Sequence, residues 1–171
     1  MKKTENNRKL TLSGMFLAMA LLMPFLTGQI PQVGSMLCPM YIPVILCGFF
    51  CGGLWGLLVG AVAPILRSFL FGMPPLFPAA FCMMFELAVY GLVAGVLYRA
   101  LPKKKWAVYG ALVCAMVLGR VVWGVVMLFC IGGGFGMEAF LAGAVTTALP
   151  GIVLQLVLIP VIVIAMEKYT E

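Results

Sequence analysis

Two things are scarce in this chain of 171 residues: it contains no histidine, and only 9% of its residues are charged. The lack of histidine excludes catalytic triads built on imidazole, haem ligation by histidine, and zinc sites that need a histidine ligand. A soluble domain carries about 25% charged residues. Because 64% of the residues here are hydrophobic, the composition is that of a membrane protein.

The sequence also lacks the residues that the common types of catalytic site need. Glu86 is the one carboxylate inside an apolar segment and away from its ends, which is too few for a two-metal site or a pair of catalytic carboxylates. No Gly-x-Ser-x-Gly motif occurs, and the glycines of IGGGFG, residues 131–136, form a turn between apolar segments rather than a phosphate-binding loop. The sequence therefore predicts that the protein is not an enzyme and holds neither a cofactor nor a metal.

Apolar segments fill most of the chain. A helix needs about 20 apolar residues to cross a bilayer. Six segments approach or exceed this length, and they cover residues 10–28, 39–53, 54–72, 79–100, 106–131 and 138–166. We expect an all-α integral membrane protein, a bundle of six transmembrane helices that forms a single membrane domain over residues 1–171. The last segment is too long for a straight span, so a kink at Pro150 is expected.

The basic residues predict how these helices are oriented. Four precede the first segment at positions 2–9, four lie between the fourth and fifth at positions 99–105, and Lys168 follows the sixth. With six spans, all three places fall on one side of the membrane, and the positive-inside rule makes that side the cytoplasm. Both termini are then cytoplasmic, and the connections near 28–38, 72–78 and 132–137 face outwards.

Three charged residues lie within the expected spans and away from their ends: Arg67, Glu86 and Arg120. Each costs about 2.5 to 3.5 kcal/mol at the centre of a membrane helix, so such residues normally face the bundle interior and mark a substrate or ion pathway. At 1.5 Å per residue they lie roughly 8 to 18 Å below the outer surface. Two arginines against one carboxylate leave a net positive charge, which an anionic part of a ligand would balance.

Polar and aromatic residues share helical faces with these charges. Tyr90 is one turn from Glu86, Trp123 follows Arg120 by three residues, and Gln155 continues a stripe of small residues on the last helix. Together they offer charges, hydrogen-bonding amides and ring surfaces to a small polar organic solute. The candidate substrate-binding residues are Arg67, Glu86, Tyr90, Arg120, Trp123 and Gln155.

A purely structural role for the charges is the alternative. Glu86 would then pair with Arg67 or with Arg120 and lock two helices together. Arg67, the nearest of the three to the surface, could instead extend to the outer headgroups. The sequence leaves open whether Glu86 grips a ligand directly or holds an arginine ready for one.

Several strings of residues resemble a known family of membrane proteins. They are SGMFLAMAL at 13–21, PMYIPVILCGFFCG at 39–52, APILRSFLFGMPPLFP at 63–78 and FELAVYGLVAGVLYR at 85–99. On these strings the chain resembles the substrate-specific S components of energy-coupling factor (ECF) transporters, of the ECF-type family related to pantothenate, folate and pyrimidine-precursor carriers. Tyr41 occupies a position where that pattern has a histidine.

The resemblance implies a function and partners. An S component of this family captures a water-soluble vitamin or a vitamin or nucleobase precursor from outside the cell. It then associates with an EcfT-type membrane scaffold and two cytosolic ATPase subunits, which drive uptake across the bacterial cytoplasmic membrane. The resemblance also implies that the small residues Gly14 and Ala18 of the first helix meet the scaffold. No nucleic acid is expected as a partner.

Two other classes of function remain open on the sequence. One is a self-sufficient secondary carrier in which Glu86 couples transport to protons. The other is a membrane assembly protein without a ligand, in which the three charges only hold helices together. Neither class needs the partner ATPases that the resemblance implies.

Overall fold

The fold was determined as a computed structural model that describes residues 2–27, 39–102, 105–132, 142–143 and 148–168. Within these residues the chain is all-α, as the sequence predicts. Its six α-helices are α1 (Lys2–Leu22), α3 (Tyr41–Cys51), α4 (Gly53–Phe71), α5 (Phe81–Ala100), α6 (Lys105–Ile131) and α8 (Leu149–Lys168). Two short helical turns, η1 (Met23–Thr27) and η2 (Leu76–Ala80), follow α1 and precede α5.

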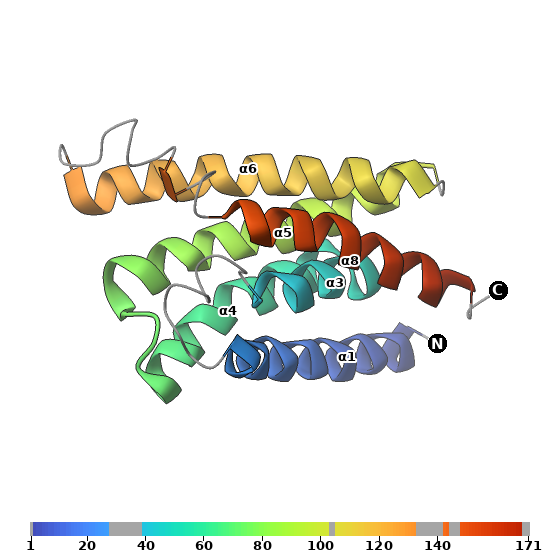
Figure 1. Cartoon of the computed structure of the whole chain (residues 1–171). Coiled ribbons are helices and arrows are strands. Elements are labelled where there is room, and N and C mark those ends of the chain that lie inside the picture. Colours follow the sequence, from blue (N-terminus) through green and yellow to red (C-terminus); the bar gives the residue numbers. More distant parts are fainter. Residues whose placement is uncertain (1, 28–38, 103–104, 133–141, 144–147, 169–171) are drawn as a thin grey trace.

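The helices form an elongated bundle in which the short helix α3 is central. Figure 1 shows α1 and α6 on opposite sides of the bundle, with α3 and α4 between them, and both chain termini at the same end. Helix α3 packs against α1, α4, α5 and α8, and every residue from Tyr41 to Phe49 is buried. Such a helix is hydrophobic all round because no side of it faces solvent or lipid.

Backbone geometry explains where two of the helices end. Gly52 has φ +105°, a value that L side chains rarely adopt, and it separates α3 from α4 by a single residue. Gly72 has φ +69° and closes α4 in the left-handed conformation, with its N–H donating to the carbonyl of Ser68 at 2.9 Å. The sharp turn at Gly52 makes α3 and α4 neighbours.

The last helix differs from the sequence expectation. A kinked helix over 138–166 was expected, but α8 begins at Leu149, so Pro150 stands in its first turn and causes no kink there. Proline suits a first helical turn because its missing N–H would have no partner inside the helix. The earlier part of that segment lies largely in residues 133–141 and 144–147, outside the described ranges.

Among the described residues, five helices are long and apolar enough to cross a membrane: Thr4–Phe25, Gly53–Phe71, Leu76–Ala100, Trp106–Ile131 and Leu149–Met166. Helix α3 has 11 residues, which at 1.5 Å per residue is about 16 Å and too short to cross alone. The six expected spans are therefore not confirmed.

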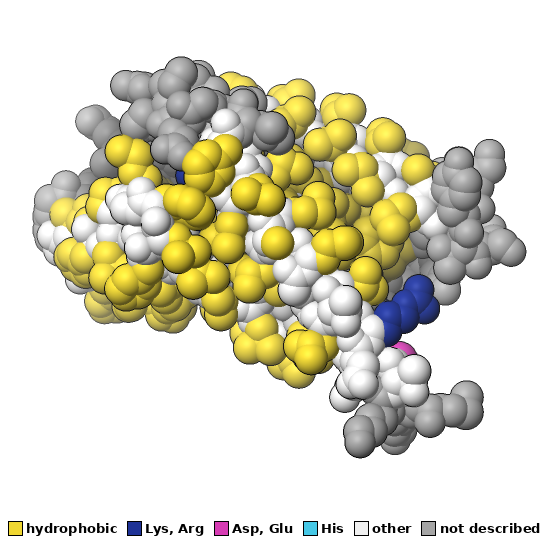
Figure 2. Space-filling model, turned by 90° about the horizontal axis from the view of Figure 1, so that it is seen from below, with side chains coloured by type: hydrophobic (Ala, Val, Ile, Leu, Met, Phe, Trp, Pro, Cys, Tyr) yellow, Lys and Arg dark blue, Asp and Glu magenta, His cyan; other side chains and the backbone are white. Residues whose placement is uncertain are grey.

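The face in Figure 2 is broadly covered by hydrophobic side chains, with a group of basic atoms near one end.

Glycines let α5 approach α3 and α4 closely. A Cβ atom at Gly56 would lie 2.6 Å from the carbonyl oxygen of Gly91, and one at Gly53 would lie 2.7 Å from that of Leu92. Gly48 meets Gly91 and Gly95 in the same way. Small residues are what allow backbones to touch between membrane helices, where lipid is as apolar as any side chain.

We expect Gly56→Ala to lower the thermal unfolding midpoint of the purified protein. The added methyl group meets backbone on α5 that cannot move aside, and overpacking of this kind costs about 1–3 kcal/mol. Gly110→Ala is the matched control, because the nearest atom to a Cβ there is Leu101 Cδ1 at 4.0 Å. Tryptophan fluorescence during heating measures both; equal midpoints for the two variants would show that the close helix contact is wrong.

Candidate functional site

Glu86 is the centre of a buried polar cluster. Glu86 lies on α5 (Phe81–Ala100) and is 0% exposed. The hydroxyl group of Tyr41 donates a hydrogen bond to its Oε2 at 2.7 Å. Nη1 of Arg120 forms an ion pair with its Oε1 at 3.0 Å. One carboxylate therefore joins three helices, α3, α5 and α6.

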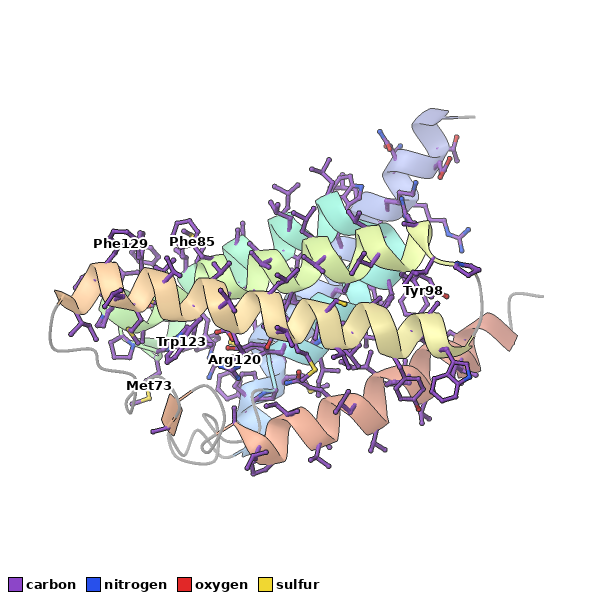
Figure 3. The ribbon with its side chains drawn as sticks, turned by 90° about the horizontal axis from the view of Figure 1, so that it is seen from above. Met73, Phe85, Tyr98, Arg120, Trp123 and Phe129 are labelled. Carbon is purple, nitrogen blue, oxygen red and sulfur yellow. The ribbon has the colours of Figure 1, made fainter. Side chains whose placement is uncertain are left out.

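Helix geometry aims these side chains at one another. Tyr41 is the first residue of α3 and is buried, as are the residues that follow it up to Phe49. Arg120 follows Leu112 and Met116 at intervals of four residues, so it continues the buried face of α6. Figure 3 shows Arg120 and Trp123 on one side of α6, with Phe129 on the opposite side.

Aromatic rings surround the ion pair. Tyr41 and Tyr90 pack edge to face with ring centroids 5.2 Å apart, and the guanidinium of Arg120 lies 5.7 Å from the centroid of the Tyr41 ring. The Tyr90 ring needs Gly119 opposite it, since a Cβ there would lie 2.6 Å from the ring. The Trp123 ring lies against Gly143 in the same way, since a Cβ atom at Gly143 would lie 2.8 Å from that ring.

Gln155 is a second buried polar group, only 2% exposed, and it shares the buried face of α8 with Gly151 and Ile159. That helix packs against α3 and α6, the helices that carry Tyr41 and Arg120. The side-chain Oε1 of Gln155 has no hydrogen-bond donor among the described residues. Buried amide oxygens normally have a partner, so this acceptor stands out among the described residues.

Arg67 belongs to a different cluster. It is 5% exposed, and its Nη1 donates to the carbonyl oxygen of Leu21, near the end of α1, at 2.8 Å. Its guanidinium lies 5.4 Å from the ring centroid of Phe25 and 5.5 Å from that of Phe71. These partners are on α1, η1 and α4, so the ion pair that Glu86 forms is with Arg120.

The structure thus joins some of the candidate residues and separates others. Glu86, Tyr90 and Arg120 meet in one cluster. Trp123 lies one turn further along α6 from Arg120. Tyr41 was not predicted as a site residue; its position 45 residues before Glu86 gave no local signal beyond its difference from the family pattern. Gly14 and Ala18 lie on an exposed face of α1, and no atom of the described residues comes within 4 Å of a Cβ built at Gly14.

The cluster is suited to binding by hydrogen bonds and ring contacts. It presents a carboxylate, a guanidinium, a hydroxyl group and three aromatic rings in a protein interior where electrostatic interactions are strong. No group of three or more histidine, cysteine, aspartate or glutamate residues that could hold a metal occurs within the described ranges.

Comparison with known proteins gives one match. The family described as ECF transporter, substrate-specific component, matches residues 8–163, which is most of the chain. The matched region includes all the residues of the Glu86 cluster. No curated protein and no solved structure matches.

We expect the ion pair to show strong coupling in a double-mutant cycle. Arg120→Gln leaves Glu86 charged and buried, and breaking a buried pair costs about 3–5 kcal/mol. The double variant Glu86→Gln/Arg120→Gln removes both charges, so it should unfold at a higher temperature than Arg120→Gln alone. Thermal unfolding of the four proteins measures this; losses that simply add would mean that the two side chains do not interact.

Proposed function

Because the chain belongs to the family of ECF transporter substrate-specific components, we propose that it captures a small water-soluble vitamin, or a vitamin or nucleobase precursor, from outside the cell. The family match over residues 8–163 is the observation that carries this proposal. A multi-pass membrane subunit of this family acts with other chains, and we propose an EcfT-type scaffold and two cytosolic ATPases as the source of energy. Its role is transport rather than catalysis.

The proposed topology has six crossings and cytoplasmic termini. Both termini lie at one end of the bundle in Figure 1. At the α3–α4 turn Arg99 donates to the carbonyl oxygen of Cys51 at 3.0 Å, which supports placing this turn with the basic residues on the inner side. In this topology α3 is a short crossing that neighbouring helices cover, so it does not need the length of a helix exposed to lipid.

We propose that the ligand binds at the cluster of Glu86, Tyr90 and Arg120. Trp123 and Gln155 flank it, and Tyr41 joins the set because it holds the carboxylate. Arg67 acts from a distance in this proposal: its hydrogen bond to Leu21 and its contact with Phe25 fix the end of α1. A buried ion pair that also takes part in binding is common for charges inside a membrane protein.

Gln155→Met should separate ligand binding from stability. Methionine fills a similar volume and removes a buried acceptor that has no donor among the described residues, so the ligand-free protein should unfold at a higher temperature. The stabilisation by ligand should shrink, because the ligand loses a hydrogen bond. Thermal unfolding in a screen of water-soluble vitamins and nucleobase precursors measures both changes.

Ile152→Met, a substitution of similar size on a half-buried position of the same helix, is the control and should leave ligand stabilisation unchanged. If Gln155→Met lowered the stability of the ligand-free protein and bound ligand as the wild type does, Gln155 would have only a structural role. A screen in which no compound stabilised the wild type would count against the proposed function itself.

Gly14→Leu and Ala18→Leu should weaken assembly with the partner subunits without disturbing the fold. Both positions are exposed on α1, and no described atom lies within 4 Å of a Cβ built at Gly14. We therefore expect a large side chain to be tolerated by this fold but to hold a partner helix away. Co-purification with the scaffold and ATPases measures assembly. Gly110→Leu, at an exposed position of α6, is the control.

Equal recovery of partners by all three variants would show that this face of α1 is not the contact. A separate measurement, of substrate uptake, tests the proposed energy source. Uptake that continued without the ATPase subunits, and stopped when the proton gradient was collapsed, would identify a self-sufficient carrier instead.

A further inference from the structure

The charges of the Glu86 cluster balance within the protein. Glu86 and Arg120 carry opposite unit charges and form an ion pair at 3.0 Å. Arg67, which is buried, is engaged by Leu21, Phe25 and Phe71 on the α1 side of the bundle. The net positive charge that the sequence suggests for this site is therefore absent from the cluster, and an anion would find no unmatched cation there.

We propose that this cluster binds a neutral ring compound that carries N–H or O–H donors, rather than an anionic or cationic solute. The proposal rests on the proposed function, since it concerns the ligand of the same site. It names the chemical class of the solute, which composition and charge count alone do not.

Desolvation makes the net charge of the ligand decisive. A charged ligand must lose its hydration on entering a protein interior, and this costs several kcal/mol unless an opposite charge compensates it. Here each charge of the pair is already compensated by the other. A carboxylate that approached Arg120 would also meet Glu86, whose Oε1 lies 3.0 Å from Nη1 of the same guanidinium. A neutral ligand avoids both costs.

Two buried acceptors of the site have no hydrogen-bond donor among the described residues. Oε1 of Glu86 receives no geometrically suitable hydrogen bond from a described residue, although it is ion-paired with Arg120. Oε1 of Gln155 likewise has no donor among them. A carboxylate oxygen can accept more than one hydrogen bond, so both oxygens can receive N–H or O–H groups of a ligand. An amide, a ureido group or an amino-substituted ring supplies such donors without a net charge.

Aromatic side chains favour a ring as the body of the ligand. Tyr41 and Tyr90 pack edge to face beside the ion pair, and Trp123 occupies the next turn of α6 after Arg120. In Figure 3 Trp123 and Arg120 point to the same side of that helix. Aromatic pairs stabilise one another beyond the effect of the area that they bury, so a ring is a favourable ligand group here.

A thermal-shift comparison of named probes tests the class. The neutral probes are nicotinamide, pyridoxine and riboflavin; the anionic ones are nicotinate, pantothenate and biotin; thiamine is the cation. The largest stabilisation of the wild-type protein should come from a neutral probe. If an anion or the cation stabilised it most, this inference would be overturned while the proposed function stood. No stabilisation by any probe would count against both.

Two variants test how the net charge of the Glu86–Arg120 pair sets the preference between anionic and neutral ligands. Glu86→Gln leaves Arg120 without its carboxylate, so the ratio of affinities for nicotinate and nicotinamide should rise about tenfold or more towards the anion. The double variant Glu86→Gln/Arg120→Gln is neutral again and should return the ratio to near that of the wild type. Isothermal titration gives the affinities, and an unchanged ratio in Glu86→Gln would contradict the proposal.

Discussion

The burial of a single carboxylate, Glu86, is the constraint on which the rest of this structure depends. An ionised carboxylate without a partner is too costly to hold in a protein interior. Tyr41 and Arg120 meet this cost together, and they come from two different helices on either side of α5. The three helices must keep their relative positions for the pair and the hydrogen bond to exist. A ligand that contacts Glu86 would therefore act on the packing of α3, α5 and α6 at once.

Close packing of glycines makes this arrangement possible. The backbones of α3 and α4 approach α5 at Gly48, Gly53 and Gly56, where a methyl group would collide with main-chain atoms. The turn at Gly52 returns the chain at once, so the short helix α3 is enclosed on all sides. The helices α3, α4 and α5 thus form a tightly packed centre. The outer helix α1 exposes the face that carries Gly14 and Ala18. A subunit that binds a solute at its centre and partner helices at its surface needs this division.

The sequence predicts the helices and the pairing candidates well because both depend on local patterns. Apolar length and the cost of a charge in a membrane single out Glu86 and Arg120, and four-residue spacing adds Tyr90. Periodicity tells which residues share a face but not which face of another helix they meet, so Arg67 is grouped with Glu86 although its partners are Leu21 and two phenylalanines. The role of Tyr41 could not be predicted for the same reason, since its contact joins residues 45 positions apart.

Helix lengths are predicted less well than helix existence. The predicted boundary between the segments 39–53 and 54–72 agrees with the turn at Gly52, but the glycines there do not show how short α3 is. Likewise, an apolar segment that contains Pro150 is compatible with a kinked helix or with one that begins at the proline. The positive φ of Gly52 and the start of α8 at Leu149 decide these cases. Both depend on tertiary packing, which outweighs the pattern of a single segment.

Mass spectrometry of the small molecules released when the protein is purified from its native membrane and denatured tests the central claim most directly. If the Glu86 cluster is the binding site of a substrate-specific component, the wild-type protein should release one compound in near-equimolar amount, and Glu86→Gln should release far less of it. The same yield from both proteins, or no compound from the wild type, would contradict a role for Glu86 in binding.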